Sequence, residues 1–232
     1  MKKKVLIAIS ATLAYSYYML NKYFPLNVKK TGDKKVIVCL GDSITFGAGV
    51  MENRKNDSYP AILGELVKDE YQVLNYGVSG ATLLKEGDFP YKDFFWKRAF
   101  KQEPDIFILM LGTNDSKPYN WNKENYEMQF LERLAEIRNC TSLKKIYVMV
   151  PPWATVIEGS ERIMFNIEED VIREQIRPFI LSLKEKEDVE VIDLYEITKG
   201  HPEYFVDGVH PNALGNRVLA EHIATYIKPN YE

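Results

Sequence analysis

Short apolar runs alternate with segments of helical periodicity along most of the chain. The runs are rich in β-branched residues, which is typical of strands buried on both faces of a parallel sheet. They lie at 36–40, 73–78, 106–111, 146–150 and 189–194. Apolar residues recur at helical spacing in 58–70, 125–139, 167–186 and 212–227. This alternation predicts a series of βαβ units and hence an α/β fold, a doubly wound α/β/α sandwich of three layers.

The N-terminal residues depart from this pattern. Three lysines precede an uncharged stretch from Val5 to Leu20, which as a helix would be about 24 Å long, slightly less than a hydrocarbon core of about 30 Å. This stretch predicts a cleaved signal peptide or a retained membrane anchor. We therefore expect 1–24 to be a targeting or anchoring segment, 25–34 a polar linker and 35–232 one catalytic domain. Either alternative places the domain outside the cytoplasm, secreted or tethered to the membrane.

Composition and charge narrow the choice of partners. The chain has 232 residues, of which 46% are hydrophobic and 27% charged, and this fits one globular domain. Its formal net charge is -3 and it has no long basic stripe, which argues against a nucleic-acid partner. Cys39 and Cys140 have no CxxC motif or histidine-rich neighbour, so we expect free thiols, with a disulfide as the alternative. The sequence indicates no metal site and no cofactor.

Small and polar residues follow each predicted strand. The five clusters read GDSIT, GVSGAT, GTNDS, PPWA and FVDGVHPN. Ligands of open α/β sheets bind outside the carboxyl ends of the strands, so all five clusters are expected at one edge.

Ser43 in the first cluster is the candidate nucleophile, because a serine hydroxyl next to a general base can attack a carbonyl carbon. We expect His201 to lie in a turn and His222 in the last helix, both without a catalytic role. His210 follows Asp207 by three residues, so a tight loop can place the carboxylate against the imidazole. The sequence therefore predicts Ser43 as nucleophile, His210 as base and Asp207 as the acid that orients it.

Attack on an ester also requires donors for the oxyanion. The backbone N–H groups of Ser43 and Gly80 and the side-chain amide of Asn114 follow the first three strands, as this role requires. Asp42 and Asp115 flank these positions and are expected to brace the loops by accepting backbone hydrogen bonds, with simple solvation as the alternative.

Each of these residues also has a purely structural interpretation. Ser43 alone is typical of a helix cap or a turn, and Asn114 of an ordinary loop. The DGVHP segment alone could be a turn before a helix capped by Asn212. The occurrence of all these features at successive strand ends favours the catalytic interpretation.

The four blocks GDSIT, NYGVSGAT, LGTND and DGVHP resemble those of the SGNH or GDSL hydrolases. The resemblance covers nearly all of 35–228. It implies a five-stranded, flavodoxin-like parallel sheet, a Ser-His-Asp hydrolase and an oxyanion hole built from Ser43, Gly80 and Asn114. The G-x-S-x-G elbow of the α/β-hydrolases is absent, because Thr45 occupies its last position.

The walls of the substrate site are expected in three segments, 83–96, 116–121 and 151–160. Their aromatic side chains are candidates for stacking on sugar rings: Tyr91, Trp96, Trp121 and Trp153. Each of them is alternatively a packing residue beneath a loop.

Within the family, the motifs look most like exported carbohydrate acetylesterases, including sialate O-acetylesterase-like members. This resemblance implies a short-chain (acetyl) esterase that acts on a small-molecule or glycan ester. One alternative is a lysophospholipase or thioesterase of the same family, favoured by the N-terminal segment and by the apolar pair Phe94 and Phe95. Another is a catalytically silent glycan-binding surface protein.

Overall fold

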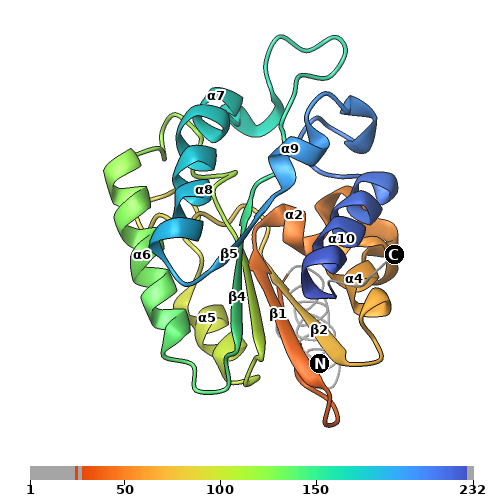
Figure 1. The fold of residues 1–232 in the computed structure, drawn as a ribbon. Helices are drawn as coiled ribbons and strands as arrows, with labels where there is room; N and C mark the ends of the chain where they lie inside the picture. The colour runs from red at the N-terminus through yellow and green to blue at the C-terminus, as the bar shows by residue number, and fades with distance from the viewer. Residues whose placement is uncertain (1–23, 26–27, 229–232) are drawn as a thin grey trace, which may run out of the picture.

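The computed structural model of the protein describes residues 24–25 and 28–228. A sheet of five parallel strands in the order β2-β1-β3-β4-β5 forms its centre (Figure 1). The strands are β1 (Lys35–Gly41), β2 (Tyr71–Gly77), β3 (Ile106–Met110), β4 (Lys145–Val150) and β5 (Glu190–Asp193). The predicted three-layer α/β/α fold and the flavodoxin-like sheet are confirmed.

The register of the sheet aligns the carboxyl ends of its strands. Gly41, the last residue of β1, pairs with Gly77 at the end of β2 and with Met110 at the end of β3. Val150 and Asp193, which end β4 and β5, pair with each other. The polar clusters that follow the strands therefore start at one edge of the sheet.

Helices cover both faces of the sheet (Figure 1). One face packs against α5 (Asp93–Phe100), α6 (Lys123–Arg138) and α8 (Arg177–Lys186), and the other against α4 (Tyr59–Leu66) and α10 (Ala213–Ile227). Alternate side chains of β1 enter the two cores, with Val38 and Leu40 on the first face and Ile37 and Cys39 on the second. Burial on both faces explains why the strands are continuous apolar runs.

Two helical regions differ from the sequence-based expectation. Asp93–Phe100 is a helix, although part of it was expected to be a wall loop, because it buries Phe95 and Trp96 in the core. The helix expected over 167–186 consists of α7 (Glu169–Val171), a π-helical turn at Ile172–Ile176 and then α8. Pro178 lacks the N–H that an α-helix needs at this point, and the wider turn lies directly before it.

Shorter elements complete the chain. They are α2 (Ser43–Phe46), α3 (Arg54–Asp57), α9 (Leu194–Thr198) and the 3-10 turns Ala48–Asn53, Met164–Asn166 and Pro202–Tyr204.

The predicted targeting segment 1–24 lies outside the described residues except for Phe24. The Phe24 ring stacks on Phe95 at a centroid distance of 5.6 Å, and the Tyr76 hydroxyl donates to the Val28 carbonyl oxygen at 3.0 Å. The described part of the expected linker therefore lies against the domain. No helix among the described residues is both long and apolar enough to cross a membrane. Both cysteines are free, as predicted.

Candidate active site

Ser43 lies at the sharp turn between β1 and α2. Asp42 caps the short helix, because its Oδ1 accepts a hydrogen bond from the Ile44 N–H at 2.9 Å. Asp42, and not Ser43, therefore has the capping role that a serine at this position can play. The Ser43 side chain remains free for another partner, although the residue is only 7% exposed.

His210 is held by a tight loop before α10. The Asp207 Oδ1 accepts hydrogen bonds from the backbone N–H groups of Val209 at 3.0 Å and His210 at 2.8 Å. Gly208 has a left-handed backbone (φ 82°), and a Cβ there would collide with the Thr155 carbonyl oxygen. Asn212 caps α10 by accepting from the Gly215 N–H at 3.0 Å. The segment is therefore a turn before a helix capped by Asn212, as its structural interpretation predicts, and its catalytic role stays a prediction.

The two loops bring Ser43, His210 and Asp207 into one hydrogen-bonded chain. The Asp207 Oδ2 lies 2.7 Å from His210 Nδ1, and His210 Nε2 lies 2.9 Å from Ser43 Oγ, although these two residues are 167 positions apart. A carboxylate can only accept, so Nδ1 carries the proton and Nε2 is the acceptor for the serine hydroxyl. This is the arrangement that activates a serine as a nucleophile.

The electrostatics of Asp207 keep its carboxyl group ionised. Burial alone raises the pKa of Asp207, but hydrogen bonds from the His210 side chain and backbone outweigh this effect and hold the pKa below its ordinary value. A permanent negative charge at this position can stabilise the positive charge that a general base acquires during the reaction.

The expected oxyanion donors lie at the neighbouring strand ends. Gly80 has a left-handed backbone (φ 81°), and among the described residues no acceptor is paired with the N–H of Gly80 or of Ser43. Asn114 is 5% exposed, and its Nδ2 donates to the Ala81 carbonyl oxygen at 3.1 Å. This bond leaves the second N–H of the amide for another acceptor.

Asp115 ties the loop that carries Gly80 to the loop that carries Asn114. Its two carboxyl oxygens accept hydrogen bonds from the backbone N–H groups of Leu83 at 3.0 Å and Leu84 at 2.8 Å. Asp42 and Asp115 are both fully buried. Both therefore brace the loops, as expected from the sequence, and neither is solvated.

Burial raises the pKa of Asp42 to about 6 and that of Asp115 to about 7, from an ordinary 3.8. Between pH 4 and these values the folded protein keeps protons that the unfolded chain has lost. A rise in pH therefore favours unfolding through these two groups. Asp207 acts in the opposite sense, but its lowered pKa places its effect below pH 4.

We expect Asp42→Asn to remove part of this pH dependence. The amide oxygen can still accept from Ile44, and the amide N–H₂ faces the Thr113 hydroxyl, which has no well-formed hydrogen bond to Asp42. Relative to the wild type, the variant should gain on the order of 2 kcal/mol in free energy of unfolding between pH 4.5 and pH 8. Urea unfolding at both pH values measures this gain. An equal difference between the two proteins at both pH values would show that Asp42 does not titrate.

The aromatic residues that were predicted to stack on sugar rings pack against the protein core and differ in how deeply they are buried. The prediction that Tyr91 contacts the substrate is wrong, because this residue is 5% exposed and its hydroxyl donates to the Tyr76 carbonyl oxygen at 2.6 Å. Trp96 is buried in the same core. Trp121 is half-buried, and its Nε1–H donates to Gln175 at 3.1 Å. Trp153 is also half-buried and packs against the core.

Two exposed aromatic residues that the sequence did not single out lie on loops around the site. The Phe165 ring lies edge-on to the His210 ring at a centroid distance of 5.1 Å and is 49% exposed. Tyr119, which is 61% exposed, follows Asn114 by five positions. Tyr119 lies within the expected wall segment 116–121, but the sequence does not distinguish its exposure from that of Trp121.

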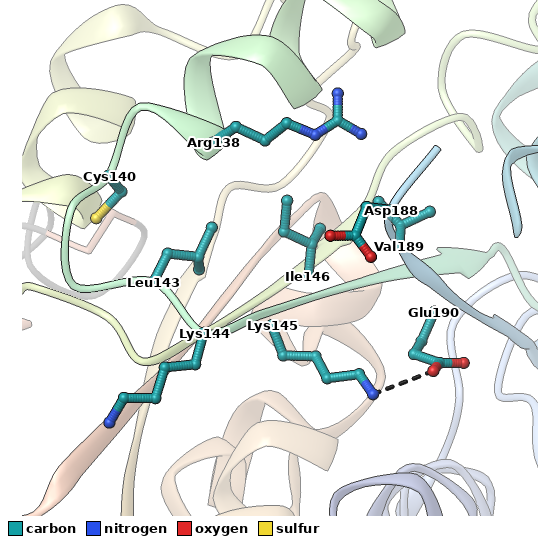
Figure 2. A pocket seen from close by; sticks show the side chains of 9 residues that line it. All are labelled: Arg138, Cys140, Leu143, Lys144, Lys145, Ile146, Asp188, Val189 and Glu190. Carbon is teal, nitrogen blue, oxygen red and sulfur yellow. Dashed lines mark hydrogen bonds and ion pairs between the residues drawn. The ribbon is translucent and has the colours of Figure 1, made fainter. Parts of the chain in front are cut away.

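Cavities occur at both ends of the sheet. One of about 350 Å³ lies at the amino ends of β4 and β5, where Lys145 and Glu190 form an ion pair at 3.0 Å (Figure 2). It contains no serine or histidine and lies at the opposite edge from Ser43. A second, which we call the loop cavity, also measures about 350 Å³ and is lined by Pro118, Tyr119, Val156, Glu161, Arg162, Ile163, Asn166, Ile167 and Glu168.

No group of three or more His, Cys, Asp or Glu side chains among residues 24–25 and 28–228 is arranged to hold a metal ion.

Comparison with known proteins gives matches to the sequence and to the fold. Residues 39–218 match the GDSL-like lipase/acylhydrolase family. An acetylxylan esterase from Xylanibacter ruminicola is 34% identical in an alignment of 206 residues that covers 83% of this chain and 43% of that protein. The chain therefore spans less than half the length of this curated relative.

Two solved structures show the same fold. A carbohydrate acetylesterase from Sinorhizobium meliloti superposes with a TM-score of 0.70 at 20% identity, covering 84% of this chain and 99% of that chain. An aryl esterase from M. smegmatis gives a TM-score of 0.70 at 21% identity with the same coverage. At these identities the likeness establishes the architecture only.

Proposed function

Since the chain belongs to the GDSL-like lipase/acylhydrolase family, we propose that it is a serine esterase that removes acetyl groups from carbohydrate. The observation that carries this proposal is the hydrogen-bonded chain from Ser43 through His210 to Asp207 at the carboxyl edge of the sheet. The expectation of a carboxylic ester hydrolase agrees with the acetylxylan esterase and aryl esterase matches.

The geometry supports a two-step mechanism. Ser43 Oγ attacks the acetyl carbonyl carbon while its proton passes to His210 Nε2, and Asp207 stabilises the resulting imidazolium. The N–H groups of Ser43 and Gly80 and the Asn114 amide bind the oxyanion. Collapse of the tetrahedral intermediate breaks the ester bond, and the leaving alkoxide takes the proton from His210. Water, deprotonated by His210, then attacks the acetyl-enzyme and releases acetate.

The alcohol part of the ester is proposed to be a carbohydrate because of what two similar proteins are named for. The names of the 34% identical relative and of one structural neighbour describe acetylesterases that act on xylan or on carbohydrate. The uncharged stretch from Val5 to Leu20 supports a location outside the cytoplasm, secreted or tethered to the membrane.

A series of substrates tests the proposal. We would compare the hydrolysis of p-nitrophenyl acetate, octanoate and dodecanoate, and measure acetate release from acetylated xylan. Fast turnover of the acetate ester, slow turnover of the longer esters and acetate release from the polymer are the expected results. Rates that climb steadily from acetate to dodecanoate would contradict the proposal.

A longer acyl chain is a second candidate because of the surface beside His210. The Phe165 ring packs against the imidazole and is 49% exposed. Its chain neighbour Met164 is 39% exposed, and Val206, whose N–H donates to the His210 carbonyl oxygen at 3.0 Å, is 53% exposed. Such a surface suits the acyl chain of a lysophospholipid or a thioester. A preference for the dodecanoate ester would support this candidate. A silent glycan-binding protein would turn over none of the esters.

Asn114→Ala is expected to lower kcat about 100- to 1000-fold and to change KM little, because the amide contributes most when the oxyanion forms. The bond from Asn114 to the Ala81 carbonyl oxygen is also lost, so unfolding must be measured alongside the kinetics. Asn139→Ala, at the end of α6, provides a matched control away from the site. If kcat per folded molecule stays at the wild-type value, Asn114 is a structural residue only.

A further inference from the structure

Two residues that line the loop cavity are chain neighbours of residues that contact the loop of the proposed triad. The Phe165 ring contacts the His210 ring, and the next residue, Asn166, lines the cavity. Across the cavity, Val156 follows Thr155, whose N–H donates to the Gly208 carbonyl oxygen at 2.9 Å in the loop that holds Asp207. A ligand in this cavity would therefore extend along the rim from the reacting ester. The loop of residues 151–168 stands above the carboxyl ends of the strands (Figure 1).

The chemistry of the lining combines one exposed aromatic ring with polar groups that have no partner. Tyr119 is 61% exposed. Among the described residues, the side chains of Glu161, Arg162 and Asn166 form no hydrogen bond or ion pair, whereas every other arginine of the described part has a partner for its side chain. These groups are free to bind a ligand.

The backbone of the loop supports a binding role. Phe165 and Asn166 have φ angles of 61° and 57°, which residues other than glycine rarely adopt. Such conformations persist where neighbouring contacts hold them, and they cluster at active sites, ligand-binding segments and switch regions. Here the Glu168 N–H donates to Ser116 Oγ at 3.2 Å and fixes the loop next to the segment that carries Tyr119.

We propose that the loop cavity binds a sugar unit of the glycan, adjacent to the unit whose acetyl ester is cleaved; this inference rests on the function proposed above. The apolar face of a sugar ring can lie on Tyr119, while planar guanidinium, carboxylate and amide groups bond to its hydroxyls. Two carboxylates, Glu161 and Glu168, accompany Arg162, so the lining favours a neutral sugar over an anion. Three charged groups also disfavour an acyl chain in the same space.

The test separates binding of the sugar from chemistry on the ester. We would measure kcat and KM of Tyr119→Ala, Tyr119→Phe and Arg162→Ala on p-nitrophenyl acetate and on acetylated xylo-oligosaccharides. On the oligosaccharides, Tyr119→Ala should raise KM about ten-fold and Arg162→Ala about three- to ten-fold. Both should leave kcat/KM on p-nitrophenyl acetate within about two-fold. Tyr119→Phe keeps the ring and should retain the wild-type KM.

Matched controls come from α10, which covers the same face of the sheet as α4. Tyr226→Ala and Arg217→Ala remove an exposed tyrosine and an exposed arginine far from the cavity and should change neither substrate's kinetics. If Tyr119→Ala and Arg162→Ala behave like these controls on an oligosaccharide that the wild type deacetylates, the sugar site is wrong and the esterase function stands.

Calorimetric binding of unacetylated xylo-oligosaccharide to Ser43→Ala provides a second measurement that needs no turnover. Binding that disappears when Tyr119→Ala is added supports the sugar site, even if the proposed acetylesterase activity fails. No detectable binding, or binding that Tyr119→Ala leaves unchanged, overturns it.

Discussion

Ser43→Ala should lower kcat for acetyl-ester hydrolysis about 10⁴- to 10⁶-fold. Removal of the nucleophile leaves only the binding and oxyanion contributions, which in serine hydrolases retain a small residual rate above water. The fold should be unaffected, because Asp42 caps α2 and, within the part of the chain that the structure describes, the Ser43 hydroxyl bonds only to His210. Hydrolysis of p-nitrophenyl acetate, with thermal unfolding of the same samples, measures both effects.

Ser182→Ala is the matched control for this variant. Ser182 lies on α8, where its hydroxyl donates to the Phe179 carbonyl oxygen of the same helix. This variant should hydrolyse the ester at the wild-type rate. Retention of more than about 1% of the wild-type kcat by Ser43→Ala would mean that another group attacks the ester.

Asp207→Asn should lower kcat about 10⁴-fold while leaving the loop in place. The amide oxygen can still accept from the N–H groups of Val209 and His210, so the backbone geometry is kept. The amide N–H₂, however, would face His210 Nδ1, which must then become an acceptor and move its proton to Nε2. The imidazole would donate to Ser43 instead of accepting its proton, and the serine would lose its base.

Kinetics and unfolding again separate catalysis from stability. Asp188→Asn, an exposed aspartate between α8 and β5, controls for the change of charge and should keep full activity. A loss of less than ten-fold in Asp207→Asn, with unchanged thermal stability, would assign Asp207 to loop structure and not to the orientation of His210.

The strands were predictable from sequence because both faces of the sheet are buried. Every residue of Ile106–Met110 is buried, so the apolar run has the length of the strand. The positions of Ser43 and Asn114 at one edge follow from this same parallel arrangement, whereas α9 and a 3-10 turn separate His210 from the end of β5. The order of the strands did not follow from the apolar pattern, and came from the resemblance to a known family.

The aromatic residues of the site could not be sorted from sequence alone. Tyr91 and Tyr119 both lie in segments expected to line the substrate site, yet one is buried and the other is exposed. The difference arises because α5 folds back on the sheet and draws Tyr91 and Trp96 into the core, a long-range packing effect that local spacing does not encode. Phe165 escaped notice for a similar reason, since its contact with His210 joins two distant loops.

In the proposed mechanism, the separation of Ser43 and His210 in the chain determines when the protein can become active during synthesis. The 167 positions between them correspond to roughly ten to thirty seconds of translation. All five strands end by Asp193, so a ribosome can deliver every strand of the sheet before it adds the histidine. A chain that stops at Asp193 lacks His210, so the Ser43 hydroxyl has no general base and is no more reactive than an ordinary alcohol. In the proposed mechanism, ester hydrolysis therefore requires synthesis through the loop before α10, and chains that end earlier cannot act on esters around them.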